Sequence, residues 1–189
     1  MRGPRPLRAA PPGAWPRAWI GAPLGALCFA LASPAGAQLR LMEAGIVCPA
    51  EREGAMAPAP LTELGEIRLI EQDIAFDLPD RAVPAIEDLS FGFRVGLAPD
   101  AAPVSGMVRV THPPMGPRAV TEQMWPVTVQ PGGDALNLFT FELPHEFVLG
   151  EWRFSVVVGG EEAVSAAFRV GPPGSNPRVD ATCLGSLLS

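Results

Sequence analysis

The sequence contains no lysine and no tyrosine, and it has only two histidines and three cysteines among 189 residues. Every cation is therefore an arginine, which we attribute to coding bias and to which we give no functional weight. The scarcity of histidine and cysteine restricts hydrolytic triads and zinc sites, because both need such residues close together. The length suits one domain, or one domain preceded by a leader.

Recognisable catalytic motifs are also missing. There is no Gly-x-Ser-x-Gly elbow, no His-Glu-x-x-His pair, no Cys-x-x-Cys, and neither of the two glycine-rich nucleotide-binding patterns. The acidic residues are scattered, so no carboxylate pair can be singled out. We therefore expect no catalytic residue, no cofactor and no enzymatic activity; an enzyme built from carboxylates that the sequence does not reveal stays as an alternative.

Residues 1–37 have the order of a secretory signal peptide. They contain four arginines and no acidic residue, then an apolar stretch over 19–32, then small residues. Fourteen apolar residues fall short of the about 20 that a membrane-spanning helix needs, so we expect no stable membrane anchor. Cleavage is predicted between Ala37 and Gln38, which would place the mature protein in the periplasm or outside the cell.

The mature chain would be strongly acidic. It would carry 10 arginines against 20 acidic residues, a net charge of −10 with histidine neutral. Such a chain repels phosphate backbones, so nucleic acid is not expected as a partner.

Two cysteines, Cys48 and Cys183, would remain after cleavage. An even pair in an oxidising compartment favours a disulfide, and the wide spacing does not resemble that of a redox-active pair. We predict that this bond joins the two ends of the domain.

The mature chain shows strand patterns and no sustained helical stripe. The clearest strand spans 89–97, where large apolar residues alternate with small or polar ones, which predicts one core face and one solvent face. The clearest hairpin spans 150–170 around Gly159-Gly160, a pair that tolerates positive φ. Further strands are predicted at 40–47, 65–70, 73–78, 104–111, 120–129 and 135–143.

Short strands between proline and glycine turns predict an all-β fold, an immunoglobulin-like antiparallel β-sandwich. The expected organisation is a signal peptide at 1–37, the sandwich at 38–172 and a C-terminal tail at 173–189. The tail is expected to return along the surface to Cys48.

A soft-metal site is one alternative function. His112, Met124 and His145 supply imidazole and thioether groups, which together select copper, and their spacing loosely resembles that of periplasmic copper chaperones. Met is also a common core residue, so the same residues fit a packed β-sandwich without any metal.

The segment Thr111-His112-Pro113-Pro114-Met115 is the most unusual stretch. Consecutive prolines favour a rigid, extended loop. We interpret residues 112–118 as a loop and His112, Pro113, Pro114 and Met115 as a contact edge for a partner, with a stiff turn as the alternative.

Several short segments together resemble the bacterial domain of unknown function 3859. They are Glu43-Ala44-Gly45-Ile46, Ser90-Phe91-Gly92, Thr111-His112-Pro113-Pro114, and Gly150-x-Trp152 followed by Phe168-x-Val170. The resemblance covers about residues 40–172. It implies an exported β-rich domain and no particular activity. We expect a binding domain whose partner is a protein or an envelope component.

Overall fold

The computed structural model describes residues 39–50 and 53–185. The predicted leader and its cleavage site at Ala37 and Gln38 lie outside this part. The described residues form ten strands and three short helical turns. The strands are β1 (Leu39–Val47), β2 (Met56–Pro58), β3 (Glu66–Arg68), β4 (Ala82–Pro84), β5 (Ser90–Leu97), β6 (Val104–Met115), β7 (Val120–Val129), β8 (Asp134–Thr140), β9 (Gly150–Val158) and β10 (Glu161–Gly171). The turns are η2 (Pro144–Glu146), α1 (Pro177–Val179) and η3 (Asp180–Leu184).

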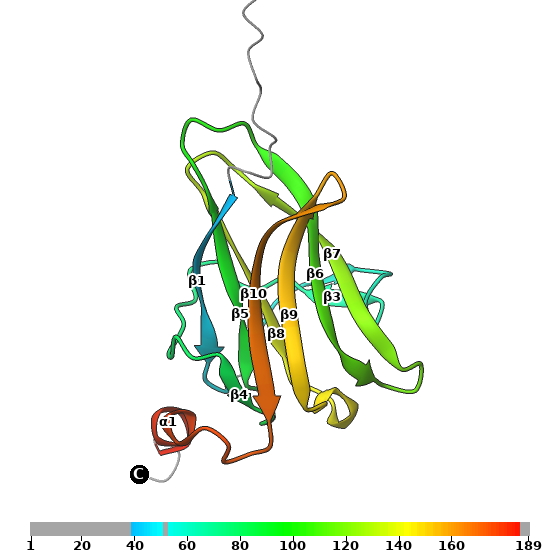
Figure 1. The fold of residues 1–189 in the computed structure, drawn as a ribbon, viewed down its shortest axis with the longest axis vertical. Helices are drawn as coiled ribbons and strands as arrows, with labels where there is room; N and C mark the ends of the chain where they lie inside the picture. The colour runs from blue at the N-terminus through cyan, green and yellow to red at the C-terminus, as the bar shows by residue number, and fades with distance from the viewer. Residues whose placement is uncertain (1–38, 51–52, 186–189) are drawn as a thin grey trace, which may run out of the picture. The chain divides into compact units, whose positions relative to one another are not determined.

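Two sheets make up the sandwich. One has the order β1-β5-β8, and the other has the order β4-β10-β9-β6-β7 (Figure 1). The chain crosses between the two sheets after β4, β5, β7 and β8, and the hairpins β6–β7 and β9–β10 stay within one sheet. This division of strands is that of an immunoglobulin-like fold, so the predicted fold class is confirmed. The short β4 pairs in parallel with β10, and the other pairs within these two sheets are antiparallel.

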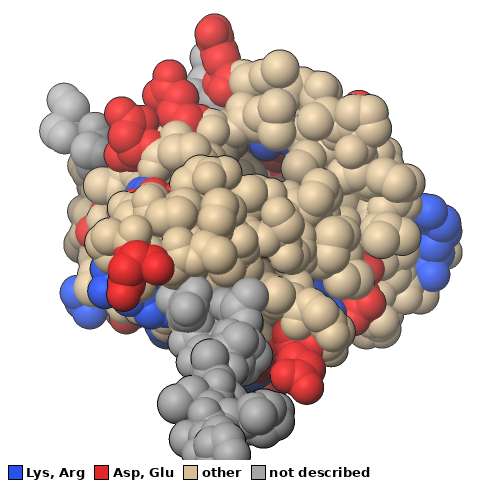
Figure 2. All heavy atoms as spheres, turned by 90° about the horizontal axis from the view of Figure 1, so that it is seen from above, with Lys and Arg blue, Asp and Glu red and all other residues tan. Residues whose placement is uncertain are grey.

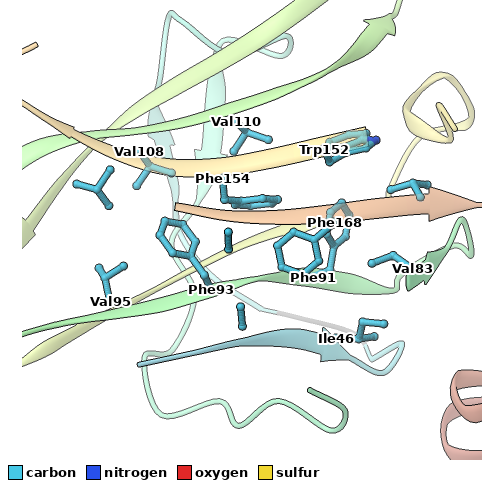
Figure 3. Packing of buried hydrophobic residues seen from close by; sticks show 14 of the residues in the cluster. Ile46, Val83, Phe91, Phe93, Val95, Val108, Val110, Trp152, Phe154 and Phe168 are labelled. Atoms are coloured by element: carbon cyan, nitrogen blue, oxygen red, sulfur yellow. The ribbon is translucent and has the colours of Figure 1, made fainter. Parts of the chain in front are cut away.

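Aromatic side chains fill the space between the sheets. Phe91 of β5 lies at the centre, with its ring 5.3–5.5 Å from those of Trp152, Phe154 and Phe168 in the opposite sheet (Figure 3). These rings are fully or almost fully buried. Because rings in edge-to-face contact bury large apolar areas, this cluster contributes strongly to the packing of the two sheets.

The strand predicted at 89–97 exists as β5, but the prediction of a solvent face was wrong. Every residue of β5 is buried. Part of the outer face is covered by residues 69–78, which we call the crossing segment. Arg94 points outward from β5, and its guanidinium donates to the carbonyl oxygens of Gln72 and Ile74, each at 2.6 Å.

The crossing segment replaces the strand that was predicted at 73–78. Its one bridge to a strand joins Leu78 to Ile46 of β1. At the adjacent Gly45, a Cβ atom would lie 2.2 Å from the Leu78 carbonyl oxygen, so glycine is needed for this close approach. The carbonyls of Gln72 and Ile74 accept from an arginine side chain and not from a neighbouring strand, which a pattern of alternation does not reveal.

Two further predicted boundaries were wrong. Residues 79–84, where no strand was predicted, contain β4, whose three residues pair with the end of β10. Residues 112–118 were expected as a loop, but β6 continues to Met115. The predicted hairpin at 150–170 is confirmed as β9 and β10, with Gly159 and Gly160 at φ values of 61° and 88°.

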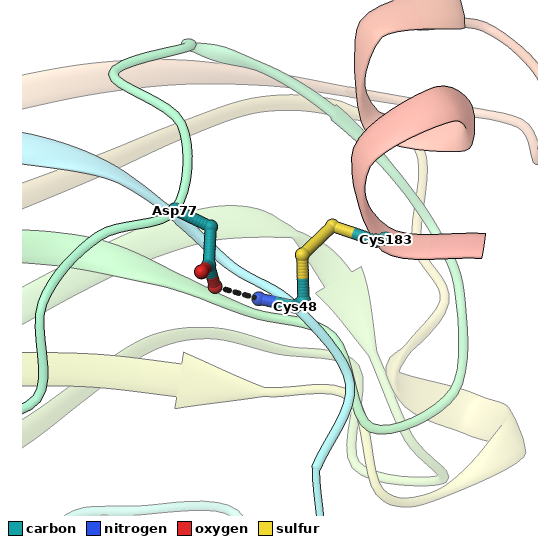
Figure 4. Close-up of a disulfide and its surroundings, with 3 residues drawn as sticks. All are labelled: Cys48, Asp77 and Cys183. Carbon is teal, nitrogen blue, oxygen red and sulfur yellow. Dashed lines mark hydrogen bonds between the residues drawn. A yellow bond between two sulfur atoms is a disulfide. The ribbon is translucent and has the colours of Figure 1, made fainter. Parts of the chain in front are cut away.

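The disulfide between Cys48 and Cys183 is present, as predicted. Its cysteines lie at the end of β1 and in η3, and the backbone N–H of Cys48 also donates to Asp77 at 2.7 Å (Figure 4). The bond attaches the C-terminal turns to the sandwich and joins positions 135 residues apart.

Candidate functional site

The three residues of the possible metal site do not converge. His112 is buried, its ring packs 4.6 Å from that of Trp152, and its Nε2 lies 3.2 Å from the amide nitrogen of Gln123. Met124 follows Gln123 in β7, so its side chain points to the opposite face of the sheet. His145 lies in η2, with Nε2 3.3 Å from a carboxylate oxygen of Glu63.

His112 is held as a neutral imidazole. Gln123 Oε1 accepts from the backbone N–H of Glu63 at 2.9 Å, so the Gln123 amide group is oriented to donate to His112 Nε2. His112 Nδ1 then donates to the Pro113 carbonyl at 2.8 Å. Burial lowers the pKa of His112 below the usual 6.5, because it disfavours the charged ring. His112 therefore connects β6 to β7 and, through Gln123, to the residues beside β3.

The predicted contact edge is partly internal. His112 and Met115 are buried, whereas Pro114 is exposed. Pro113 packs against the start of β9, where a Cβ atom on Gly150 would lie 2.8 Å from the Pro113 ring. The residues that carry the family resemblance thus meet in two places, Gly45 beside Gly92 and His112-Pro113 beside Gly150-x-Trp152. Both places are packing contacts.

The best candidate site is a groove of about 460 Å³ on the side of the sandwich where β7 and β8 are the outermost strands. The hairpin β2–β3 and its flanking residues, 55–69, form the outer wall of this groove. The hairpin is attached to β7 by a hydrogen bond from Met124 N to Leu61 O at 3.0 Å. The floor includes Trp125, whose indole N–H donates to Asn137 Oδ1 at 3.2 Å across the two sheets.

The hairpin wall exposes large apolar side chains beside the groove. Met56, Leu64 and Leu69 all line it and are 46%, 50% and 53% exposed. Leu61 at the neighbouring tip is 59% exposed. Exposed apolar residues gathered in one place mark interaction surfaces more often than isolated ones do.

Charged residues at the groove are mainly acidic. Glu66, Asp134, Glu142 and Glu146 line it together with one cation, Arg68. Arg68 and Glu142 form an ion pair at 3.3 Å, and Asp134 pairs with Arg94 at 3.3 Å. Burial raises the pKa of Glu146, whose carboxylate accepts from the backbone N–H groups of Glu142 and Leu143.

The end of the sandwich at the top of Figure 1 has a different character. Uncharged side chains cover most of the face seen in Figure 2, and acidic and basic groups lie around its border.

A second hollow, of about 640 Å³, lies elsewhere, between the start of β9 and the residues after β10, with Leu149 and Phe147 in its lining. This hollow is more open and has few polar groups, so the groove is the better defined candidate.

Sequence reasoning missed the groove. Residues 65–70 were predicted only as a further strand, with no site beside it. The available signal was the leucine spacing at 61, 64 and 69, which does not fit a single face of a strand.

Two further structural findings concern the described residues. Residues 39–50 and 53–185 contain no helix long and apolar enough to cross a membrane. The same part contains no group of three or more His, Cys, Asp or Glu side chains placed to hold a metal ion.

The architecture defines an immunoglobulin-like sandwich with a groove beside an added hairpin. The chain belongs to the family described as a domain of unknown function, DUF3859, which it matches over residues 36–170. Its structure is similar to the crystal structure of an immunoglobulin-like protein from Pseudomonas aeruginosa, with 20% sequence identity and a TM-score of 0.41. The similarity covers 73% of this chain and 100% of that chain. No protein of curated function matches the sequence.

Proposed function

We propose that this protein is an exported binding domain that holds a segment of a partner protein in the groove between the hairpin β2–β3 and the strands β7 and β8. The observation that carries the proposal is the combination of a well-defined groove with three half-exposed apolar residues along its wall, Met56, Leu64 and Leu69. Free apolar surface of this kind gains free energy when a partner covers it.

Export is supported by the pattern of residues 1–37 and by the disulfide. A bond between Cys48 and Cys183 persists in oxidising compartments, and a basic, apolar and small-residue order directs secretion. The periplasm or the extracellular space is therefore the proposed location.

Binding rather than catalysis is supported by the residues of the groove. Its described lining contains no histidine, cysteine or serine, and the buried Glu146 already accepts two backbone hydrogen bonds. A catalytic base or nucleophile needs a free, activated side chain at the reacting atom. The groove instead offers apolar contacts and hydrogen-bonding groups, which suit recognition.

Photo-crosslinking in intact cells tests this function. A photoreactive residue replaces Leu64 in one full-length variant and Leu149 in a matched variant, because both leucines are 50% exposed and Leu149 lies outside the groove. We expect a covalent adduct with another polypeptide from position 64 that is lost when Leu69→Glu is added. Equal adducts at both positions, or none at position 64, would overturn the proposal.

A further inference from the structure

β8 presents a free strand edge to the groove. Backbone hydrogen bonds just beyond the two ends of β8 show which of its residues face β5. The N–H of Leu97 donates to the Gly133 carbonyl, and the N–H of Phe141 donates to the Leu89 carbonyl. The odd-numbered residues of β8 therefore hydrogen-bond toward β5, and the backbone groups of the even-numbered residues point away from it.

Two side chains occupy the ends of this edge and leave its middle open. The N–H of Leu136 donates to Gln72 Oε1 at 2.8 Å, and the N–H of Glu142 donates to Glu146 Oε2 at 2.7 Å. Between them lie two outward N–H groups that have no partner in the part of the chain that the structure describes. These belong to Leu138 and Thr140.

A second strand edge faces the groove from the hairpin. At the two ends of β3, the Gly65 carbonyl accepts a backbone hydrogen bond from the β2 side and the Leu69 N–H donates one to it. The backbone groups of Glu66 and Arg68 therefore point away from β2. Arg68 reaches Glu142, and Gln72 reaches Leu136. The chain from Arg68 to Gln72 therefore runs antiparallel to β8. It contacts residues at or next to the two ends of β8, and the groove lies between these two contacts.

β7, the other outermost strand at the groove, is blocked. Pro126 lies at one of its outward positions and has no N–H, and the N–H of Met124 already donates to Leu61. Proline and covering segments are common ways of preventing strand addition, and Leu138 and Thr140 of β8 have neither. Of the two outermost strands at the groove, β8 is therefore the one whose edge is open to a ligand.

The charged residues of the groove indicate which ligand side chains it would attract. Four acidic residues and one arginine line the groove, and Glu66 has no ion pair among the described residues. An arginine or lysine side chain on the ligand would be attracted to this surface. The apolar residues Leu64 and Leu69 favour aliphatic or aromatic neighbours.

We propose that the groove binds an extended peptide segment in which apolar residues alternate with arginine or lysine, and that this segment adds to β8 as a β-strand. The inference rests on the proposed function, because it specifies what the groove holds. Main-chain hydrogen bonds to Leu138 and Thr140 would supply affinity, and the alternating side chains would supply selectivity.

Fluorescence anisotropy of the disulfide-bonded mature protein tests this inference. The probe is a mixture of short labelled peptides in which Val, Ile, Leu or Phe alternates with Arg. N-methylation of alternate backbone amides removes at least two hydrogen bonds, so we expect about tenfold weaker binding. Replacing Arg by Glu in the peptides should weaken binding at least as much. The Glu66→Gln variant should bind a few-fold less tightly, and Glu161→Gln, which changes an exposed acid outside the groove, should bind unchanged.

The outcomes separate the two proposals. Binding that tolerates N-methylation would overturn strand addition, and equal binding of the Glu-containing peptides would overturn the charge assignment. No binding of any peptide, together with a cross-link from position 64, would overturn the inference and retain the proposed function. The absence of both would overturn both. A Leu138→Pro variant adds a test on the protein side, because proline there removes one outward N–H without removing a bond to β5.

Discussion

Arg94 connects the outer face of the three-stranded sheet to the crossing segment. Its side chain is 10% exposed and donates to two backbone carbonyls, to Glu43 at 2.8 Å and to Asp134 at 3.3 Å. Both carboxylates are partly solvated, so the two partly buried carbonyls lose the most hydrogen-bonding energy when the guanidinium is absent.

We expect Arg94→Ala to lower the free energy of unfolding by about 2–3 kcal/mol, because it leaves the carbonyls of Gln72 and Ile74 without donors. Urea denaturation measures the change. Arg153→Ala is the control: Arg153 is half exposed and pairs with Glu162, so its loss should lower stability by less than about 1 kcal/mol. Equal effects of the two substitutions would contradict the role given to Arg94.

His112 gives stability a dependence on pH. Because burial lowers its pKa in the folded state, the unfolded chain takes up a proton first as the pH falls below about 6.5. Its contribution to stability is therefore complete above that pH and is lost progressively below it. A protonated Nε2 would also face the Gln123 amide group, which is itself a donor.

NMR titration of the histidine ring protons checks this prediction directly. We expect the His112 ring to titrate below pH 6.5 in the folded protein. In addition, stability should fall less between pH 7.5 and pH 5.5 in a His112→Phe variant, which keeps a ring beside Trp152. A His112 ring that titrates above 6.5 would show that the charged form is stabilised, contrary to the contacts described.

At the scale of elements, the hairpin β2–β3 depends on a few contacts to the sandwich. Gln123 accepts from Glu63 N, and Arg118 donates to the Glu63 carbonyl. We expect Gln123→Leu to speed amide hydrogen exchange over residues 59–69, because it leaves the partly buried Glu63 N–H unpaired at a cost of about 1–3 kcal/mol. Exchange in β9 and β10 should stay unchanged, and the exposed Gln130→Leu should change neither region.

The elements differ in how well the sequence predicts them. β5 and the hairpin β9–β10 could be predicted from alternation and, in the hairpin, from the turn glycines, although alternation did not reveal that both faces of β5 are buried. The crossing segment could not, since its position depends on Arg94, a residue distant in sequence whose partners are backbone carbonyls. The groove is hidden for a related reason: it forms where the hairpin meets β8, and local patterns carry no information on that contact.

At the scale of the whole molecule, the disulfide is expected to be a major source of stability. In the chain-entropy treatment, a bond that closes a loop of this size contributes about 4–5 kcal/mol, less any strain. We expect Cys48→Ser and Cys183→Ser to lower Tm by similar amounts and the double variant to show no further loss. Thermal unfolding with and without a reductant measures this. An unchanged Tm in reduced protein would show that the bond adds little.

Export is the prediction that concerns residues outside the described part. Mass spectrometry of protein recovered from the cell envelope and the medium should find an N-terminus at Gln38, because the signal pattern ends with Ala37. A full-length chain retained in the cytosol, with its thiols free to react with an alkylating agent, would remove the basis for the proposed location.

The bond between Cys48 and Cys183 also makes a covalent ring of everything between them, including the hairpin wall and the crossing segment. A protease in the surroundings of the cell that cuts one loop in this ring would open the ring without releasing a fragment. The nicked protein would keep both sides of the groove attached, and two cuts or a reductant would be needed to separate them. Loss of binding after proteolysis should therefore lag behind the first cleavage seen on a reducing gel.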